Sequence, residues 1–249
     1  MDKFMQGNFP SALMMIGSVG LTVHCKQLVK NFDGVPLIMA WGKPVSGKTT
    51  AVNVVLSIIG QRESIGEMTL AAALEISSRR TLFFFWDDVS NFDVLEKLAV
   101  SALNNVLYWW SKKSASSQKW LLPRTVPIIT MNPQALKKTT KSNSKKLGRV
   151  FSSIAVVPFN RTEVEQSLEN SLNLQIELQP LLETAVHSIG IILKLGDAFA
   201  TMRTDPVFQE VLAMSERFNA LDLRANFNYA LVVLKWNGYQ SLRYVPLGG

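Results

Sequence analysis

The amino-acid sequence predicts an α/β protein in which a wound parallel sheet is followed by an all-helical C-terminal region. Short apolar runs alternate with helical patterns as far as Thr162, which is typical of parallel strands joined by helices. After Thr162 the strand pattern stops and helical periodicity continues. We therefore divide the chain into an N-terminal helical segment (residues 1–33), an α/β core (34–162) and a helical C-terminal region (163–249).

Each element is predicted from local periodicity. Leu70, Leu74 and Ser77 share one face of a helix, and Leu95, Leu98 and their neighbours recur at the same spacing. Helices are predicted over residues 9–31, 51–59, 67–80, 92–110, 163–182, 184–202, 206–219 and 225–236. Strands are predicted over residues 35–41, 82–86, 126–131 and 150–159, with one more in the connection between residues 58 and 67.

Composition limits the classes of protein. The chain has 249 residues, 47% of them hydrophobic, which is enough for one large domain or two small ones. Cys25 is the only cysteine, which excludes an intramolecular disulfide and a cysteine-based zinc site. His24 and His187 lie far apart in the sequence, so a metal site built on histidine is not expected. We expect a reducing, intracellular location. The net charge of +7 favours acidic partners such as nucleic acid.

The N-terminal apolar stretch has two interpretations. Residues 11–23 resemble the core of a signal peptide, but residues 24–27 offer no clear small-residue cleavage site. The stretch is too short to span a bilayer. A second apolar run, residues 191–200, is interrupted by a lysine and an aspartate. We therefore predict a packed N-terminal helix and no association with a membrane.

The segment GKPVSGKTT lies between a predicted strand and a predicted helix. Gly42, Gly47, Lys48 and Thr49 match G-x-x-x-x-G-K-[ST] at every fixed position. Such a phosphate-binding loop (P-loop) curls its N–H groups around phosphates at a helix N-terminus, while the lysine reaches the β- and γ-phosphates and the hydroxyl binds Mg²⁺. The predicted nucleotide-binding residues are Gly42, Pro44, Val45, Ser46, Gly47, Lys48, Thr49 and Thr50. The alternative is a structural turn.

Two carboxylates follow the second well-defined apolar run. Residues 82–86 are bulky and apolar, which is typical of a strand buried on both faces, and Asp87 and Asp88 come directly after them. Asp87, together with Thr49, is predicted to hold Mg²⁺, and Asp88 to orient and polarise the attacking water. The alternative is a polar turn in which Asp88 or Ser90 caps the next helix.

Asn132 ends the next apolar run. The carboxyl ends of parallel strands line the ligand crevice of an open sheet, so Asn132 is predicted to lie near Asp88 and to help position the water. The alternative is an Asn-Pro turn formed with Pro133.

An arginine precedes the last predicted strand. Arg149 is a candidate for a residue that supplies positive charge to a neighbouring subunit's γ-phosphate, with Arg161 as its substitute. A surface or DNA-contacting arginine is the alternative. Arg203, Arg217 and Arg224 lie in the helical tail, and the sequence does not choose among them as sensors of the γ-phosphate.

The order of these motifs resembles that of the additional-strand P-loop ATPases, within the AAA+ and superfamily-3 helicase group. The resemblance covers Val35 to Arg161. It implies a P-loop NTPase core that uses ATP and Mg²⁺, a ring-shaped homo-oligomer, and action on nucleic acid in a replication or mobile-element context. Asp88 departs from the more frequent Glu, and we expect no origin-binding or primase domain within residues 1–33.

The basic residues are unevenly distributed. Between Lys97 and Thr162 the chain has no Asp or Glu, although it has many lysines and arginines. By the resemblance, residues 111–123 correspond to a hairpin that projects into a central pore. The candidates for binding single-stranded nucleic acid are Lys112, Lys113, Lys119 and Trp120, since cations follow phosphates while an aromatic ring stacks on a base. A solvated basic loop is the alternative.

Three functions are consistent with the sequence. The first is an oligomeric ATPase that moves or remodels nucleic acid. The second is a nucleotide-dependent switch or assembly module, and the third is a degenerate ATPase that binds nucleotide without turnover.

Overall fold

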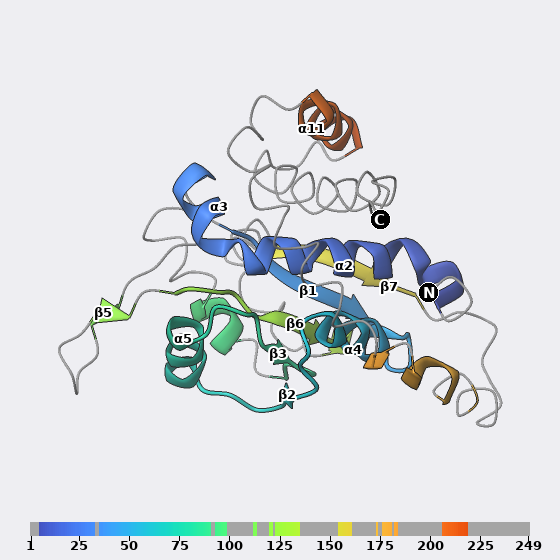
Figure 1. The fold of residues 1–249 in the computed structure, drawn as a ribbon, viewed down its shortest axis with the longest axis horizontal. Helices are drawn as coiled ribbons and strands as arrows, with labels where there is room; N and C mark the ends of the chain where they lie inside the picture. Colours follow the sequence, from blue (N-terminus) through green and yellow to red (C-terminus); the bar gives the residue numbers. More distant parts are fainter. Residues whose placement is uncertain are drawn as a thin grey trace, which may run out of the picture.

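The computed structural model describes most of the predicted core and parts of the tail. The described residues are 5–32, 35–90, 93–98, 112–113, 120–121, 123–134, 154–160, 173, 176–180, 182–183 and 206–218. Within these ranges the chain forms five parallel strands, a separate two-stranded pair and several helices (Figure 1).

The central sheet is entirely parallel and has the order β2-β3-β6-β1-β7. Its strands are β1 (Leu37–Gly42), β2 (Ser64–Ile65), β3 (Phe85–Trp86), β6 (Ile128–Met131) and β7 (Ile154–Phe159). Met39 in β1 lies opposite Ile129 in β6 and Val156 in β7. The predicted wound parallel α/β sheet is therefore confirmed. β6 separates β1 from β3, so the ends of these three strands adjoin one another at one edge.

Strand β3 is shorter than the apolar run that predicted it. Phe83 and Phe84 are buried but lie before the strand, which contains only Phe85 and Trp86. β3 pairs over only these two residues with each of its neighbours, β2 and β6. The predicted strand between residues 58 and 67 is this β2.

Among the described residues, the helices agree with those predicted over 51–59, 67–80 and 206–219, but not with the one predicted over 9–31. Of the helix predicted over 163–182 only residues 173, 176–180 and 182 are described, and the helices predicted over 184–202 and 225–236 lie outside the described residues. The helices with described bounds are η1 (Gln6–Asn8), α2 (Phe9–Val23), α3 (Cys25–Phe32), α4 (Lys48–Ile58), α5 (Leu70–Arg79) and α11 (Pro206–Phe218). The single helix expected over residues 9–31 is divided at His24 into α2 and α3. The hydroxyls of Ser18 and Thr22 donate to carbonyls three residues back, a contact that tends to bend helices.

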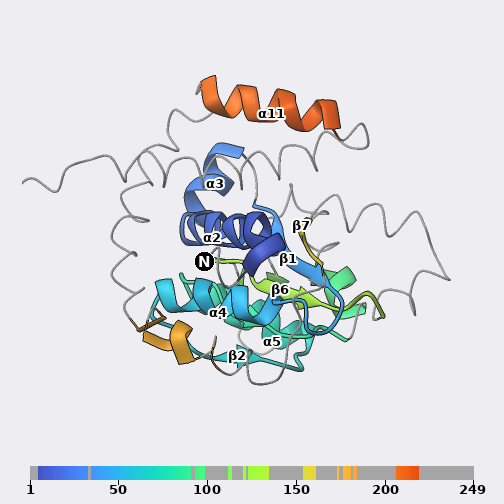
Figure 2. The same ribbon diagram turned by 90° about the vertical axis from the view of Figure 1, so that its right-hand side faces the viewer.

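The core lies between the sheet and the helices that run along it. α2 packs against α4, β7 and β1, and its buried side chains include Met15, Val19 and Leu21. Figure 2 shows α11 outermost, on the far side of α2 and α3 from the sheet. Residues 93–98 are helical, and the rest of the helix predicted over 92–110 lies outside the described residues. No described helix has the length and hydropathy needed to cross a membrane.

A short antiparallel pair lies apart from the central sheet. β4 (Lys112–Lys113) pairs with β5 (Trp120–Leu121), with Lys113 opposite Trp120. Figure 1 shows β5 at one end of the molecule, beyond the edge of the five-stranded sheet. The two antiparallel strands expected of a hairpin over residues 111–123 are therefore present, and residues 114–119 lie outside the described residues.

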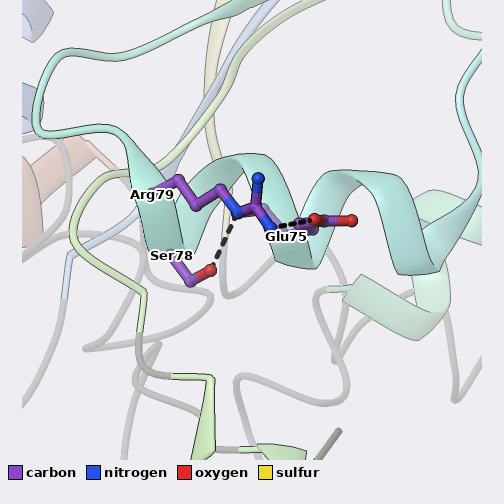
Figure 3. Close-up of polar contacts among 3 residues, drawn as sticks. All are labelled: Glu75, Ser78 and Arg79. Carbon is purple, nitrogen blue, oxygen red and sulfur yellow. Dashed lines mark hydrogen bonds and ion pairs between the residues drawn. The ribbon is translucent and has the colours of Figure 1, made fainter. Parts of the chain in front are cut away.

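The outer face of α5 carries an exposed ion pair (Figure 3). Thr69 caps the helix by accepting a hydrogen bond from the Ala72 N–H at 3.2 Å. Towards the C-terminal end of the helix, Arg79 and Glu75 form an i, i+4 ion pair at 2.8 Å. The Ser78 hydroxyl donates to the backbone carbonyl of Glu75 at 2.8 Å, so the serine bond does not depend on the Glu75 carboxylate.

Candidate active site

The P-loop connects the end of β1 to the start of α4. Gly42 has no room for a side chain, because an added Cβ would lie 2.2 Å from the carbonyl oxygen of Phe159 in β7. Gly47 adopts a left-handed conformation with φ of 85° at the N-cap of α4. Val45 also has a positive φ, 59°, which is rare for a β-branched residue. The loop thus turns sharply twice and presents the N-terminus of α4 to its concave side.

The Lys48 ammonium group lies back against this loop. It donates to the carbonyl oxygens of Gly42 and Lys43 at 2.9 and 2.8 Å, and to Asn132 Oδ1 at 3.0 Å. Lys48 is only 7% exposed, so these acceptors replace most of the water that a lysine normally binds. The positive charge is therefore held beside the Gly42 and Lys43 carbonyls at the start of the loop, where phosphate would bind.

The two carboxylates at the end of β3 are held by the neighbouring strand. Thr130 in β6 donates its hydroxyl to Asp87 Oδ1 at 2.6 Å and accepts from the Asp88 N–H at 2.7 Å. The Val89 N–H donates to the Thr130 carbonyl at 3.0 Å. Asp88 has a φ of 46°, which aspartate tolerates better than most residues. Asp87 is half-buried and Asp88 is exposed, so the two acids lie in different environments.

Asn132 joins the lysine to the second acid. Its amide nitrogen donates to Asp88 Oδ1 at 2.5 Å while its oxygen accepts from Lys48. Because lysine can only donate and a carboxylate can only accept, these two partners fix the orientation of the amide. A continuous chain of hydrogen bonds therefore runs from the P-loop, through the end of β6, to the end of β3.

Charge and burial act on Lys48 in opposite directions. Burial lowers the pKa of Lys48 below its ordinary value, while the negative charges of Asp88 and Asp87 raise it. The two carboxylates thus favour the protonated lysine that a phosphate ligand requires.

The donor set at this edge fits Mg²⁺ as the resemblance implies. Among the described residues, no three His, Cys, Asp or Glu side chains gather into a metal-binding group. Mg²⁺ in a phosphate site does not need such a group, because it keeps several waters and takes one or two protein oxygens besides the phosphates. The Asp87 carboxylate and the exposed Thr49 hydroxyl, on the first turn of α4, are hard oxygen donors of this kind.

The remaining predicted loop residues differ in exposure. Pro44 and Val45 lie exposed at the tip of the loop, with Val45 77% exposed. Ser46 is buried, and its hydroxyl has no hydrogen-bond partner among the described residues. Thr50 is half-buried on α4.

The more distant candidates are only partly described. The backbones of Lys112, Lys113 and Trp120 lie in the β4–β5 pair, and Lys119 lies outside the described residues. Arg149 and Arg161 also lie outside them, as do Arg203 and Arg224. Arg217 lies in α11.

Two polar residues of the site were not assigned a role from the sequence. Thr130 had a usable signal, since it is a polar residue in an apolar strand, two positions before Asn132 and so on the same face. Asn8 had none, because 34 positions separate it from Gly42 in the sequence. In the structure its side chain donates to the Ser46 carbonyl at 3.0 Å.

Comparison with known proteins supports the fold. No protein-family model and no curated protein sequence matches the chain. The structure is similar to a solved structure described as the active helicase Cch of SCCmec type IV, with a TM-score of 0.58 at 12% sequence identity. The match covers 95% of this chain and 44% of the helicase, so the chain spans less than half of that protein's length. At this identity the likeness concerns the fold, an α/β core shared with a helicase.

Proposed function

We propose that this chain is an ATP-binding and ATP-hydrolysing P-loop motor that acts on nucleic acid. The observation that carries the proposal is the hydrogen-bonded chain Lys48–Asn132–Asp88, which links the P-loop to the carboxylates. A loop that merely turned the chain would not require a buried lysine to contact a polar group from another strand. The fold shared with a helicase is consistent with the proposal.

The proposal gives each polar residue a role. Lys48 and the N–H groups of the loop bind the phosphates, and Thr49 and Asp87 hold Mg²⁺, which neutralises charge on the phosphates when bound. Asp88 orients the attacking water and accepts its proton. Asn132 keeps Asp88 and Lys48 at a fixed separation, so that water and phosphate are aligned.

Nucleic acid is proposed to bind at the β4–β5 hairpin. The support is the pairing of a Lys-Lys strand with a strand that begins at Trp120, in a stretch of sequence without acids. Lys112, Lys113 and Lys119 would follow the phosphate backbone, and Trp120 would stack on a base. Substitution of the three lysines by glutamine should then weaken single-stranded DNA binding and make it less salt-dependent.

A homo-oligomeric ring is proposed from the resemblance, with Arg149 completing the neighbouring site. An arginine that acts in trans is worth about 10³–10⁵ in rate in other phosphoryl-transfer systems. Arg149→Ala and Lys48→Ala subunits, each inactive alone, should regain activity when mixed, because an intact loop then meets an intact arginine. If mixed oligomers form and stay inactive, Arg149 does not act in trans, and Arg161 becomes the candidate.

The deciding experiment measures ATP hydrolysis with and without single-stranded DNA, on wild type and Lys48→Ala, at a known oligomeric state. We expect turnover that requires Lys48 and increases with DNA. ATP-dependent binding to a partner without turnover would instead indicate a switch or assembly module. Equal ATP binding by wild type and Lys48→Ala would contradict the proposal altogether.

A further inference from the structure

Asn8 occupies an N-cap position, but its side chain makes no capping hydrogen bond to the helix. It is the last residue of η1 and occupies the N-cap position of α2. Asparagine is favoured there because its side chain accepts from a free N–H of the first helical turn, but Asn8 makes no such bond. It is also 5% exposed, which is unusual for an asparagine. Its side chain therefore serves another purpose.

The Asn8 side chain connects two distant segments. Its amide nitrogen donates to the carbonyls of Ser46, in the P-loop, and Asn160, just after β7, at 3.0 and 2.7 Å. Its oxygen accepts from the Asn160 N–H at 2.8 Å. All the contacts are to backbone, so they fix the course of both segments. The P-loop also meets β7 closely at Gly42, which is held next to the Phe159 carbonyl.

The bond to Ser46 determines the direction of one peptide group of the loop. The peptide between Ser46 and Gly47 is trans, so its N–H points opposite to its carbonyl. With the carbonyl held by Asn8, the Gly47 N–H points away from Asn8. Gly47 tolerates both signs of φ, so rotation of this peptide would otherwise cost little.

We propose that Asn8 is a positioning residue for the P-loop: it locks the Ser46–Gly47 peptide so that the Gly47 N–H is directed at the nucleotide phosphates. The inference rests on the proposed function, since it presumes that the loop binds nucleotide. It adds to the site a residue that precedes the core, and it makes nucleotide affinity depend on the junction of η1 and α2.

Ser11 provides the matched control. Its hydroxyl donates to the Pro158 carbonyl at 2.5 Å, so it also joins α2 to β7 through a backbone oxygen. Among the described residues, it makes no hydrogen bond to the P-loop. Ser11→Ala thus removes a hydrogen bond between α2 and β7 but leaves the hydrogen bond that orients the Ser46–Gly47 peptide.

The experiment measures the Mg²⁺-ATP dissociation constant by calorimetry for wild type, Lys48→Ala, Asn8→Ala, Asn8→Asp and Ser11→Ala. The melting temperature of each is recorded with and without Mg²⁺-ATP. Asn8→Ala should raise the dissociation constant about tenfold, the order expected from one lost hydrogen bond. Asn8→Asp should raise it further, because a carboxylate would face two carbonyl oxygens. Ser11→Ala should stay within about twofold of wild type. The shift in melting temperature on ATP addition should shrink in the Asn8 variants, as it does in Lys48→Ala, and should be unchanged in Ser11→Ala.

Two outcomes would overturn the inference. One is Asn8→Ala binding Mg²⁺-ATP like wild type while Lys48→Ala does not. The other is an equal loss in Asn8→Ala and Ser11→Ala, which would indicate general packing of α2. If Asn8→Asp does not fold, Asn8→Ala decides alone. If wild type does not bind Mg²⁺-ATP, or Lys48→Ala binds it equally, the proposed function is contradicted. The inference about Asn8 is then contradicted as well, because it depends on nucleotide binding by the loop.

Discussion

Two polar contacts of nearly equal length lie in opposite environments of this molecule. The Lys48 ammonium is 2.9 Å from the Gly42 carbonyl and is 7% exposed. The Arg79 guanidinium is 2.8 Å from Glu75 on α5, where the two side chains are 77% and 52% exposed (Figure 3). The length of a contact therefore does not show which of the two contributes more to stability. The burial of the contact decides this, because water replaces an exposed contact at little cost but cannot reach a buried one.

The two regions also differ in how far along the chain their partners lie. Arg79 and Glu75 are one helical turn apart and meet wherever α5 forms. Asn132 meets Lys48 across 84 positions and Asp88 across 44, so these contacts require the completed sheet. Substitutions in the hydrogen-bonded network of Lys48, Asn132, Asp88 and Thr130 should consequently alter nucleotide binding and hydrolysis. Substitutions on the exposed face of α5 should change either property little.

Among the hydrogen-bonded residues Lys48, Asn132, Asp88 and Thr130, the largest effect is expected at Asp88. Asp88→Asn should retain Mg²⁺-ATP binding and lose about 10²–10⁴ in hydrolysis rate, because the amide oxygen still accepts from Asn132 but takes no proton from water. Single-turnover hydrolysis and equilibrium binding separate the two steps. Asp87→Asn is the matched control: it should weaken Mg²⁺-dependent binding. Normal hydrolysis by Asp88→Asn would place the base elsewhere.

Lys48→Ala should have the next largest effect. It removes the positive charge at the loop and the donor to Asn132, and the expected loss is about 10²–10³ in turnover together with weaker Mg²⁺-ATP binding. Circular dichroism should show a folded protein, since removal of the long side chain leaves a space in which water can bind the carbonyls of Gly42 and Lys43. Binding and turnover equal to wild type would refute the phosphate site.

Thr130→Val tests whether the Thr130 hydroxyl in β6 is needed to hold Asp87 and Asp88 in place. Valine keeps the shape of threonine but leaves Asp87 Oδ1 and the Asp88 N–H without their shared partner. Loss of such a supporting contact typically costs 10–100-fold in metal affinity or activity, so we expect about that loss in Mg²⁺-dependent turnover. Titration with Mg²⁺ at fixed ATP measures it. An unchanged Mg²⁺ requirement would mean that Asp87 needs no support from β6.

The sequence was sufficient for the local features of the site. The fixed positions of the P-loop, the acids after an apolar run and Asn132 at a strand end each follow from neighbours in the chain. Their order along the sequence, with the parallel-sheet rule, predicted that they meet at one edge. The structure places Lys48, Asn132 and Asp88 in one hydrogen-bonded chain; their catalytic roles remain predictions.

Features that depend on tertiary contact could not be predicted. Asn8 looks like an ordinary helix cap, and only the completed fold brings it to Ser46 and Asn160. The length of β3 follows its pairing, which covers only two residues with β2 and two with β6, and not the length of its apolar run. The division of the N-terminal helix at His24 likewise has no glycine or proline to mark it.

The smallest effect is expected on α5. Glu75→Ala removes the exposed ion pair with Arg79, worth about 0.3–0.5 kcal/mol, while alanine recovers part of this through higher helix propensity. The Ser78 hydroxyl keeps its acceptor, because it bonds to the backbone carbonyl of Glu75. We therefore expect a change in melting temperature of less than about 2 °C and unchanged Mg²⁺-ATP affinity. Arg79→Ala is the control and should behave alike. A loss of ATP affinity in either variant would mean that α5 is coupled to the site, and that exposure does not separate the two regions.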